Sequence, residues 1–163
     1  MKHRESGIGI TLAVLCLVTA SQAQAPGWPI YKSSELGFSI QHPAEAVVSH
    51  KAGKAFSYIR IQKSSGEGQL RPGEFLIEIF VVPEQFWGAK KGWPDCNQLS
   101  NAKSVKIGKL TGYRGGGQEA SEGEGIVDSL CVTKGKRMYK INALRPSNDA
   151  AVTDKILDSF HLQ

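Results

Sequence analysis

The stretch from Phe86 to Trp93 holds the residue types best suited to recognition chemistry. Phe86, Trp87 and Trp93 stand there together with Lys90 and Lys91. Aromatic side chains beside cations are typical of interface anchors, because they supply a large contact area at low entropic cost. These five residues form the candidate protein-binding site. The alternative is that Trp87 and Trp93 cover an end of the core, in which case replacing either with alanine would cost about 3–5 kcal/mol.

The residues that commonly carry catalysis are present without the spacing that catalysis needs. His42, His50 and His161 lie far apart and form neither an H-x-x-x-H nor an H-E-x-x-H pattern. No serine stands in a G-x-S-x-G context. We therefore expect a non-enzymatic protein with no catalytic residue, no metal ligand and no cofactor.

A run of three glycines, Gly115 to Gly117, raises the question of anion binding. Phosphate-binding loops open a helix, whereas this run is followed by the acids Glu119, Glu122 and Glu124. We interpret the run as a flexible loop between strands, and the acids as a solvated turn.

The first 23 residues have the organisation of a secretory signal. Residues 2–4 are basic, residues 8–18 are mainly apolar, and Ser21 and Ala23 are small residues at the positions that a signal peptidase reads. The apolar run is shorter than the roughly 20 residues that span a bilayer. We expect cleavage after Ala23, with Ala25 as an alternative, and a periplasmic or secreted mature protein without a transmembrane segment.

The chain has three cysteines, of which Cys16 lies in the signal and Cys96 and Cys131 remain. Cys16 raises the alternative of a lipid anchor, but Leu15 stands before it, where a lipoprotein signal has a small residue. An oxidising compartment favours pairing Cys96 with Cys131. The alternative is two unpaired thiols.

Charge gives little support for nucleic-acid binding. The 20 basic and 15 acidic residues leave a net charge of +5, and the basic residues are scattered rather than gathered in a stripe. We expect no nucleic-acid partner.

The hydrophobic pattern predicts strands along most of the mature chain. Alternation of apolar and polar residues indicates strands at residues 37–43, 56–62, 74–82, 104–107, 110–118, 125–133 and 137–144. Residues 74–82 are apolar on both faces, which predicts a central strand with layers packed on either side. The Lys134-Gly135 turn predicts an antiparallel hairpin.

Two helices are predicted in addition to the strands. A short one is expected around residues 95–102. A closing helix is indicated by Val152, Ile156 and Phe160 at helical spacing, with Ser147 or Asn148 as its N-cap. The pattern predicts an α+β domain over residues 24–163, in which helices cover a mainly antiparallel sheet of about six strands.

Three short motifs make this layout similar to the PsbP-like fold family. Residues 37–43 match "GF-x-I-x-x-P", residues 105–113 match "V-x-I-G-x-x-x-G-Y", and residues 156–160 match "I-L-x-S-F". The family includes a photosystem II extrinsic subunit, a Ran-binding nuclear protein and many secreted bacterial proteins. The resemblance implies an α/β/α sandwich used as a protein-binding scaffold. The chain departs from the pattern at His42, where an aromatic residue is common, and in its tryptophan-rich connection.

Three functions remain open at this point. The first is a protein-binding accessory factor of the cell envelope. The second is an immunity or inhibitor protein directed against a secreted toxin or hydrolase. The third is a carrier of a small apolar ligand held between helix and sheet.

Overall fold

The computed structural model describes residues 27–64, 69–88, 93–120 and 125–163. The expected signal, residues 1–23, lies outside these ranges. The described residues form ten strands and one α-helix: β1 (Ile30–Ser33), β2 (Phe38–Gln41), β3 (Val47–Ala52), β4 (Ser57–Lys63), β5 (Phe75–Pro83), β6 (Lys103–Ile107), β7 (Leu110–Glu119), β8 (Ile126–Lys134), β9 (Arg137–Arg145), α1 (Ala151–Asp158) and β10 (His161–Leu162).

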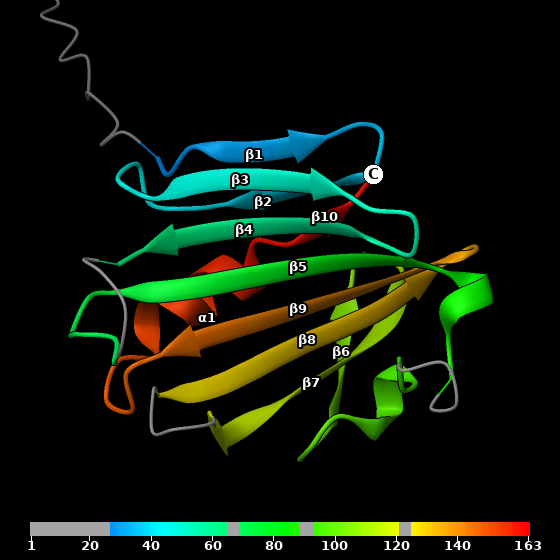
Figure 1. Cartoon of the computed structure of the whole chain (residues 1–163). Coiled ribbons are helices and arrows are strands. Elements are labelled where there is room, and N and C mark those ends of the chain that lie inside the picture. The colour runs from blue at the N-terminus through cyan, green and yellow to red at the C-terminus, as the bar shows by residue number, and fades with distance from the viewer. Residues whose placement is uncertain (1–26, 65–68, 89–92, 121–124) are drawn as a thin grey trace, which may run out of the picture.

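The strands make two antiparallel sheets (Figure 1). The larger sheet has seven strands in the order β3-β4-β5-β9-β8-β7-β6, and the smaller one has three in the order β1-β2-β10. β5 lies between β4 and β9, so residues 74–82 form an interior strand, although the central strand of the order is β9. The residues of β5 that face the core are buried, and of those on the opposite face Val82 is buried while Leu76, Glu78 and Phe80 are partly buried.

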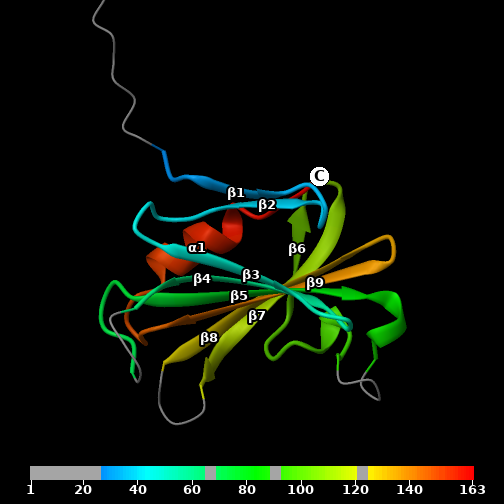
Figure 2. The ribbon, with the colours of Figure 1, turned by 45° about the horizontal axis from the view of Figure 1, so that its top comes forward.

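One face of the seven-stranded sheet carries the main core. Alternate residues of β5, among them Ile77 and Ile79, belong to this core together with Phe38 from the small sheet and Ile156 from α1. The small sheet and the helix therefore cover the same face (Figure 2). We call the opposite face, which points away from α1, the outer face.

The β8–β9 hairpin forms as predicted. Lys134 pairs with Arg137, and Gly135 between them has a φ of 56°, a left-handed conformation that suits glycine. The pairing continues for nine residues on each strand and places β8 beside the sheet's central strand, β9.

The predicted helix around residues 95–102 is wrong. The chain makes only a 3-10 turn at Cys96–Gln98 before β6 begins at Lys103. The cap of the closing helix also differs, because Ala150 is the N-cap and no side chain caps it. The chain turns first, with the Asp149 amide donating to Pro146 O at 3.2 Å, so α1 begins after the predicted caps.

The three glycines Gly115 to Gly117 lie inside β7, so their interpretation as a flexible loop is wrong. The register of β7 on β8 shifts between Gly116 and Gln118, which marks a β-bulge. Gly117 has a φ of 76°, as such a bulge requires. A Cβ on Gly115 would collide with Ser100 O, so glycine lets the residues after the 3-10 turn lie directly on the strand.

Sequence patterns missed β1, β3 and β10. β3 is an edge strand with mostly exposed residues, so burial imposes no alternation on it. The prediction of an antiparallel sheet is confirmed, with seven strands in place of six. Its α/β/α layering is not shown, because the described residues contain one α-helix, on one face.

Candidate functional site

The outer face is formed by the residues of β4, β5, β8 and β9 that alternate with core residues. Phe80 lies opposite Lys140 in the β5–β9 pairing, and Cys131 lies opposite Lys140 in the β8–β9 pairing. These three side chains therefore share the middle of the outer face. The connection between β5 and β6 contains the predicted site residues, and its described residues Phe86, Trp87, Trp93 and Cys96 pack on this part of the sheet.

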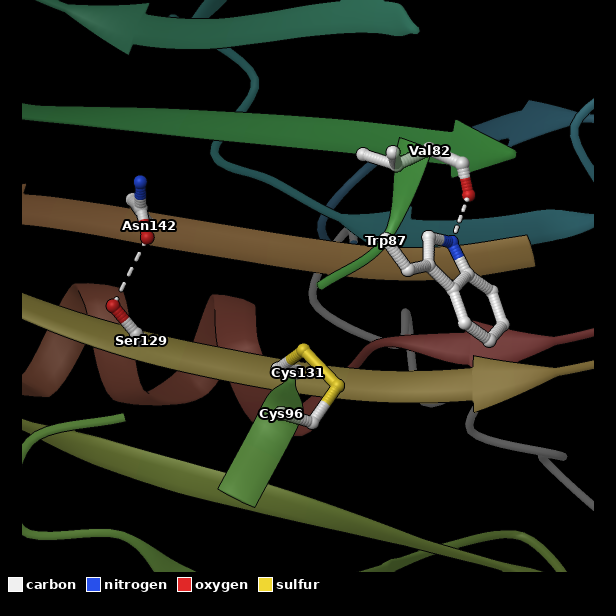
Figure 3. The surroundings of a disulfide bond; sticks show 6 residues. All are labelled: Val82, Trp87, Cys96, Ser129, Cys131 and Asn142. Carbon is white, nitrogen blue, oxygen red and sulfur yellow. Dashed lines mark hydrogen bonds between the residues drawn. A yellow bond between two sulfur atoms is a disulfide. The ribbon is translucent and has the colours of Figure 1, made fainter. Parts of the chain in front are cut away.

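A disulfide fixes that connection to the sheet. Cys96 and Cys131 are bonded, with Cα atoms 5.2 Å apart, which confirms the predicted pair (Figure 3). Both cysteines are buried with Val82 and Met138 in a second, smaller core cluster on the outer face. The bridge thus holds the 3-10 turn against β8.

Trp87 is held at the start of the connection. Its indole Nε1 donates a hydrogen bond to Val82 O at 2.9 Å, and its ring packs against the second core cluster (Figure 3). Phe86 closes the preceding 3-10 turn, Glu84–Phe86, and packs on the same cluster. Both aromatic side chains are partly exposed.

Trp93 belongs to what we call the aromatic cluster, formed by Phe56, Tyr58, Phe80 and Trp93. The ring centroid of Trp93 lies 5.3 Å from that of Phe56 and 5.2 Å from that of Phe80. Tyr58 packs at a tilt against Phe80 with centroids 5.1 Å apart. Such distances are favourable for aromatic pairs, and all four side chains remain partly exposed.

The aromatic residues of the predicted site fit neither a fully exposed binding site nor a fully buried cover of the core. Phe86, Trp87 and Trp93 are neither fully exposed nor fully buried: each packs on the second core cluster and still presents part of its surface. The Gly88 amide donates to Trp93 O at 2.7 Å, so two residues within the connection lie side by side. Lys90 and Lys91 lie outside the described residues.

A polar network borders the aromatic cluster. The Tyr58 hydroxyl donates to Glu78 Oε1 at 2.7 Å, and Arg60 Nε donates to the same hydroxyl at 2.8 Å. Burial, followed by the bond to Glu78, raises the pKa of Tyr58, and the bond to Tyr58 raises the pKa of Arg60. The network holds the Glu78 carboxylate toward β4.

Beside the aromatic cluster lies a pocket of about 360 Å³, which we call the polar pocket. Strands β7, β8 and β9 form its floor, and the segment around Leu99 forms a wall. Its polar lining residues are Gln98, Ser100, Gln118, Ser129, Lys140 and Asn142. Ser129 Oγ donates to Asn142 Oδ1 at 3.0 Å (Figure 3). Partial burial lowers the pKa of Lys140.

Sequence reasoning missed this pocket. The available signal was the alternation in β9, where Lys140 and Asn142 interrupt the apolar residues Tyr139, Ile141 and Ala143. Polar residues at alternate positions of a strand usually face solvent. Only the sheet order shows that β9 is central and that its outer face is partly covered.

The described ranges contain neither a cluster of metal ligands nor a membrane-spanning helix. The residues with assigned positions contain no group of three or more potential metal ligands among His, Cys, Asp and Glu. Within the same ranges, no helix has the length and apolar character needed to span a bilayer.

Comparison with solved structures finds similarity to a protein from Bacteroides thetaiotaomicron, with a TM-score of 0.50 and 16% sequence identity. The match covers 84% of this chain and 48% of the other, so the chain spans about half the length of that neighbour. At this identity the likeness concerns the fold alone. No family model matches the chain, and no curated protein matches it.

Proposed function

We propose that this protein is a non-enzymatic, protein-binding accessory factor of the cell envelope, and that its binding site is the aromatic cluster with Phe86, Trp87 and the neighbouring Lys90 and Lys91. The observation that carries the proposal is the partly exposed Trp93, which packs edge-to-face on Phe56 and at a tilt on Phe80 beside a disulfide-fixed segment. A large aromatic surface that is already ordered binds with little further entropic cost.

The disulfide also supports a location outside the cytoplasm. Disulfides persist in oxidising compartments and are rare in the cytosol. Together with the signal-like residues 1–23, this agrees with a periplasmic or secreted protein.

Processing at the expected signal gives a direct test of location. Mature protein recovered from the exported fraction should begin near Gln24, because Ser21 and Ala23 fit the cleavage subsites. N-terminal sequencing or intact mass measures this. Exported protein that retains Met1 would contradict the assignment.

The motifs shared with PsbP-like proteins support a related proposal, that the domain has that fold with its α/β/α layering. The three matching segments lie on β2, on the β6–β7 hairpin, and on α1 with the residues that follow it. Scaffolds of this kind are used for protein binding, but a shared fold does not transfer function. The binding surface therefore has to be tested on its own.

Trp93→Ala is expected to abolish capture of the partner from an envelope extract. The free energy of unfolding should fall by about 1–2 kcal/mol, less than for a fully buried aromatic residue, since Trp93 is partly exposed. Affinity capture with immobilised mature protein, alongside thermal melting, measures both effects.

Trp28→Ala is the matched control. Trp28 is also partly exposed, but it packs against the main core, and Lys155 Nζ lies 3.9 Å from its ring centroid. A protein retained by the wild type and by Trp28→Ala, and lost with Trp93→Ala, supports the site. Equal retention by all three chains would exclude it. If the captured protein is a toxin or hydrolase that this protein inhibits, the immunity or inhibitor function replaces the accessory one.

A pocket between α1 and the sheet favours the ligand-carrier function as a second candidate. It has a volume of about 290 Å³, and its apolar walls include Ile107, Leu130 and Leu157. Native mass spectrometry tests this candidate, and a co-purifying small molecule would support it.

A further inference from the structure

Lys140 places a positively charged side chain in a partly buried position, which is energetically unfavourable. It lies on β9, the central strand of the seven-stranded sheet, between Phe80 on one side and Cys131 on the other. The side chain is half-buried, and this burial lowers its pKa. Placing a cation in partial burial costs free energy unless an anion or hydrogen-bond acceptors compensate it.

No carboxylate compensates this cation within the described residues. The nearest by register is Glu78, which lies diagonal to Lys140 and bonds instead to Tyr58 and Arg60. No described residue lining the polar pocket is acidic, and no ion pair joins Lys140 to a described carboxylate.

The pocket also offers neutral hydrogen-bond donors. Because Asn142 Oδ1 accepts from Ser129, the Asn142 amide nitrogen is left as a donor. Gln98 and Gln118 line the same pocket and carry further amide donors. One cation among neutral donors balances the single charge of a carboxylate but only part of the charge of a phosphate, which carries nearly two charges when it is a monoester at neutral pH.

The segment that forms the wall of the pocket is fixed before any ligand arrives. The Cys96–Cys131 bond tethers it, the Gly116 amide donates to Ser100 O at 3.2 Å, and Asn101 Nδ2 donates to Gly116 O at 3.2 Å. Because the wall is already ordered, binding to this pocket causes little further loss of conformational entropy.

Charge over the rest of the outer face agrees with an acidic partner. By strand register, the described sheet residues on this face include the cations Lys51, Arg60, Lys106 and Lys140, against the single acid Glu78. Such an imbalance attracts an acidic segment and disfavours a basic one.

We propose that the polar pocket binds a carboxylate of the partner protein, paired with Lys140, while the adjacent aromatic cluster takes a neighbouring apolar side chain. This inference rests on the proposed protein-binding function and names the chemistry that the partner must present. The carboxylate belongs either to an acidic side chain or to a chain terminus.

Chemical-shift titration of the ¹⁵N-labelled mature protein tests the proposal with defined probes. N-acetylphenylalanine presents a terminal carboxylate beside an aromatic ring, N-acetylglutamate α-amide presents a side-chain carboxylate, and N-acetylphenylalanine amide presents none. At least one carboxylate probe should shift the resonances of Gln98, Gln118, Ser129 and Asn142, and the amide should not. The carboxylate probe that binds more tightly shows whether the partner presents a chain terminus or an acidic side chain.

Lys140→Gln is expected to weaken binding of the tighter-binding carboxylate probe by about tenfold or more, because a charge-assisted hydrogen bond is lost. Lys32→Gln, an exposed lysine on β1 of the other sheet, removes the same charge and should leave binding unchanged. In the wild type, the bound carboxylate should raise the pKa of Lys140, read from its ¹³Cε resonance. A merely structural lysine would not show this change.

Several results would overturn the proposal: shifts of equal size with the amide, affinity unchanged in Lys140→Gln, or inorganic phosphate bound more tightly than either carboxylate. Partner capture separates this inference from the proposed function. If Trp93→Ala loses the partner while Lys140→Gln keeps it at full affinity, protein binding stands and the carboxylate assignment falls.

Discussion

Replacing both Cys96 and Cys131 with alanine is expected to lower the free energy of unfolding by about 3–4 kcal/mol. The two residues are separated by 35 positions, and closing a loop of that size restricts the unfolded chain. Urea unfolding of the mature protein, with and without the two substitutions, measures the loss. Capture of the partner should also weaken, because the wall of the polar pocket loses its tether to β8.

The double substitution avoids the free thiol that a single substitution would leave. Wild-type protein that has been reduced and alkylated serves as a second comparison and should lose similar stability. A loss below about 1 kcal/mol in the double variant would show that the segment is held by its packing and hydrogen bonds rather than by the bridge.

Phe38→Ala is expected to cost about 3–5 kcal/mol, the range found for fully buried aromatic residues. Phe38 has no exposed surface, and its ring centroid lies 5.5 Å from that of Phe160 and 6.2 Å from that of Tyr139. It therefore joins the small sheet to the seven-stranded sheet and to the segment after α1. Chemical denaturation measures the loss.

Phe86→Ala is the matched control for this prediction. The same atoms are removed from a side chain that is partly exposed and packs on the second core cluster. The expected loss is clearly smaller than for Phe38→Ala. Equal losses would mean that the docking of the small sheet contributes less to stability than its burial indicates.

The two halves of the outer face serve the proposed function in different ways. The aromatic cluster offers contact area, while Lys140 and the amide donors of the polar pocket offer selectivity for an anionic group. The disulfide-tethered segment follows directly after Trp93 of the aromatic cluster and forms a wall of the polar pocket. This division explains why separate variants, Trp93→Ala and Lys140→Gln, test separate parts of the interface.

The sequence by itself determined the elements whose patterns are set by burial. The interior position of β5 was predictable because this strand is apolar on both faces, and the β8–β9 hairpin because its turn needs a residue that accepts a positive φ. The Cys96–Cys131 pair followed from the expected compartment. Elements with weak burial, such as the edge strand β3, left no comparable signal.

The functional surface was decided by tertiary structure. Trp93, Phe56 and Phe80 are far apart in the chain and meet only because β4 and β5 pair in one register beneath the connection. Lys140 looks like an ordinary outward-facing residue of a strand until the sheet order places it on the central strand beside a tethered wall. Alternation along a strand fixes which residues share a face, whereas what covers that face depends on contacts between distant segments.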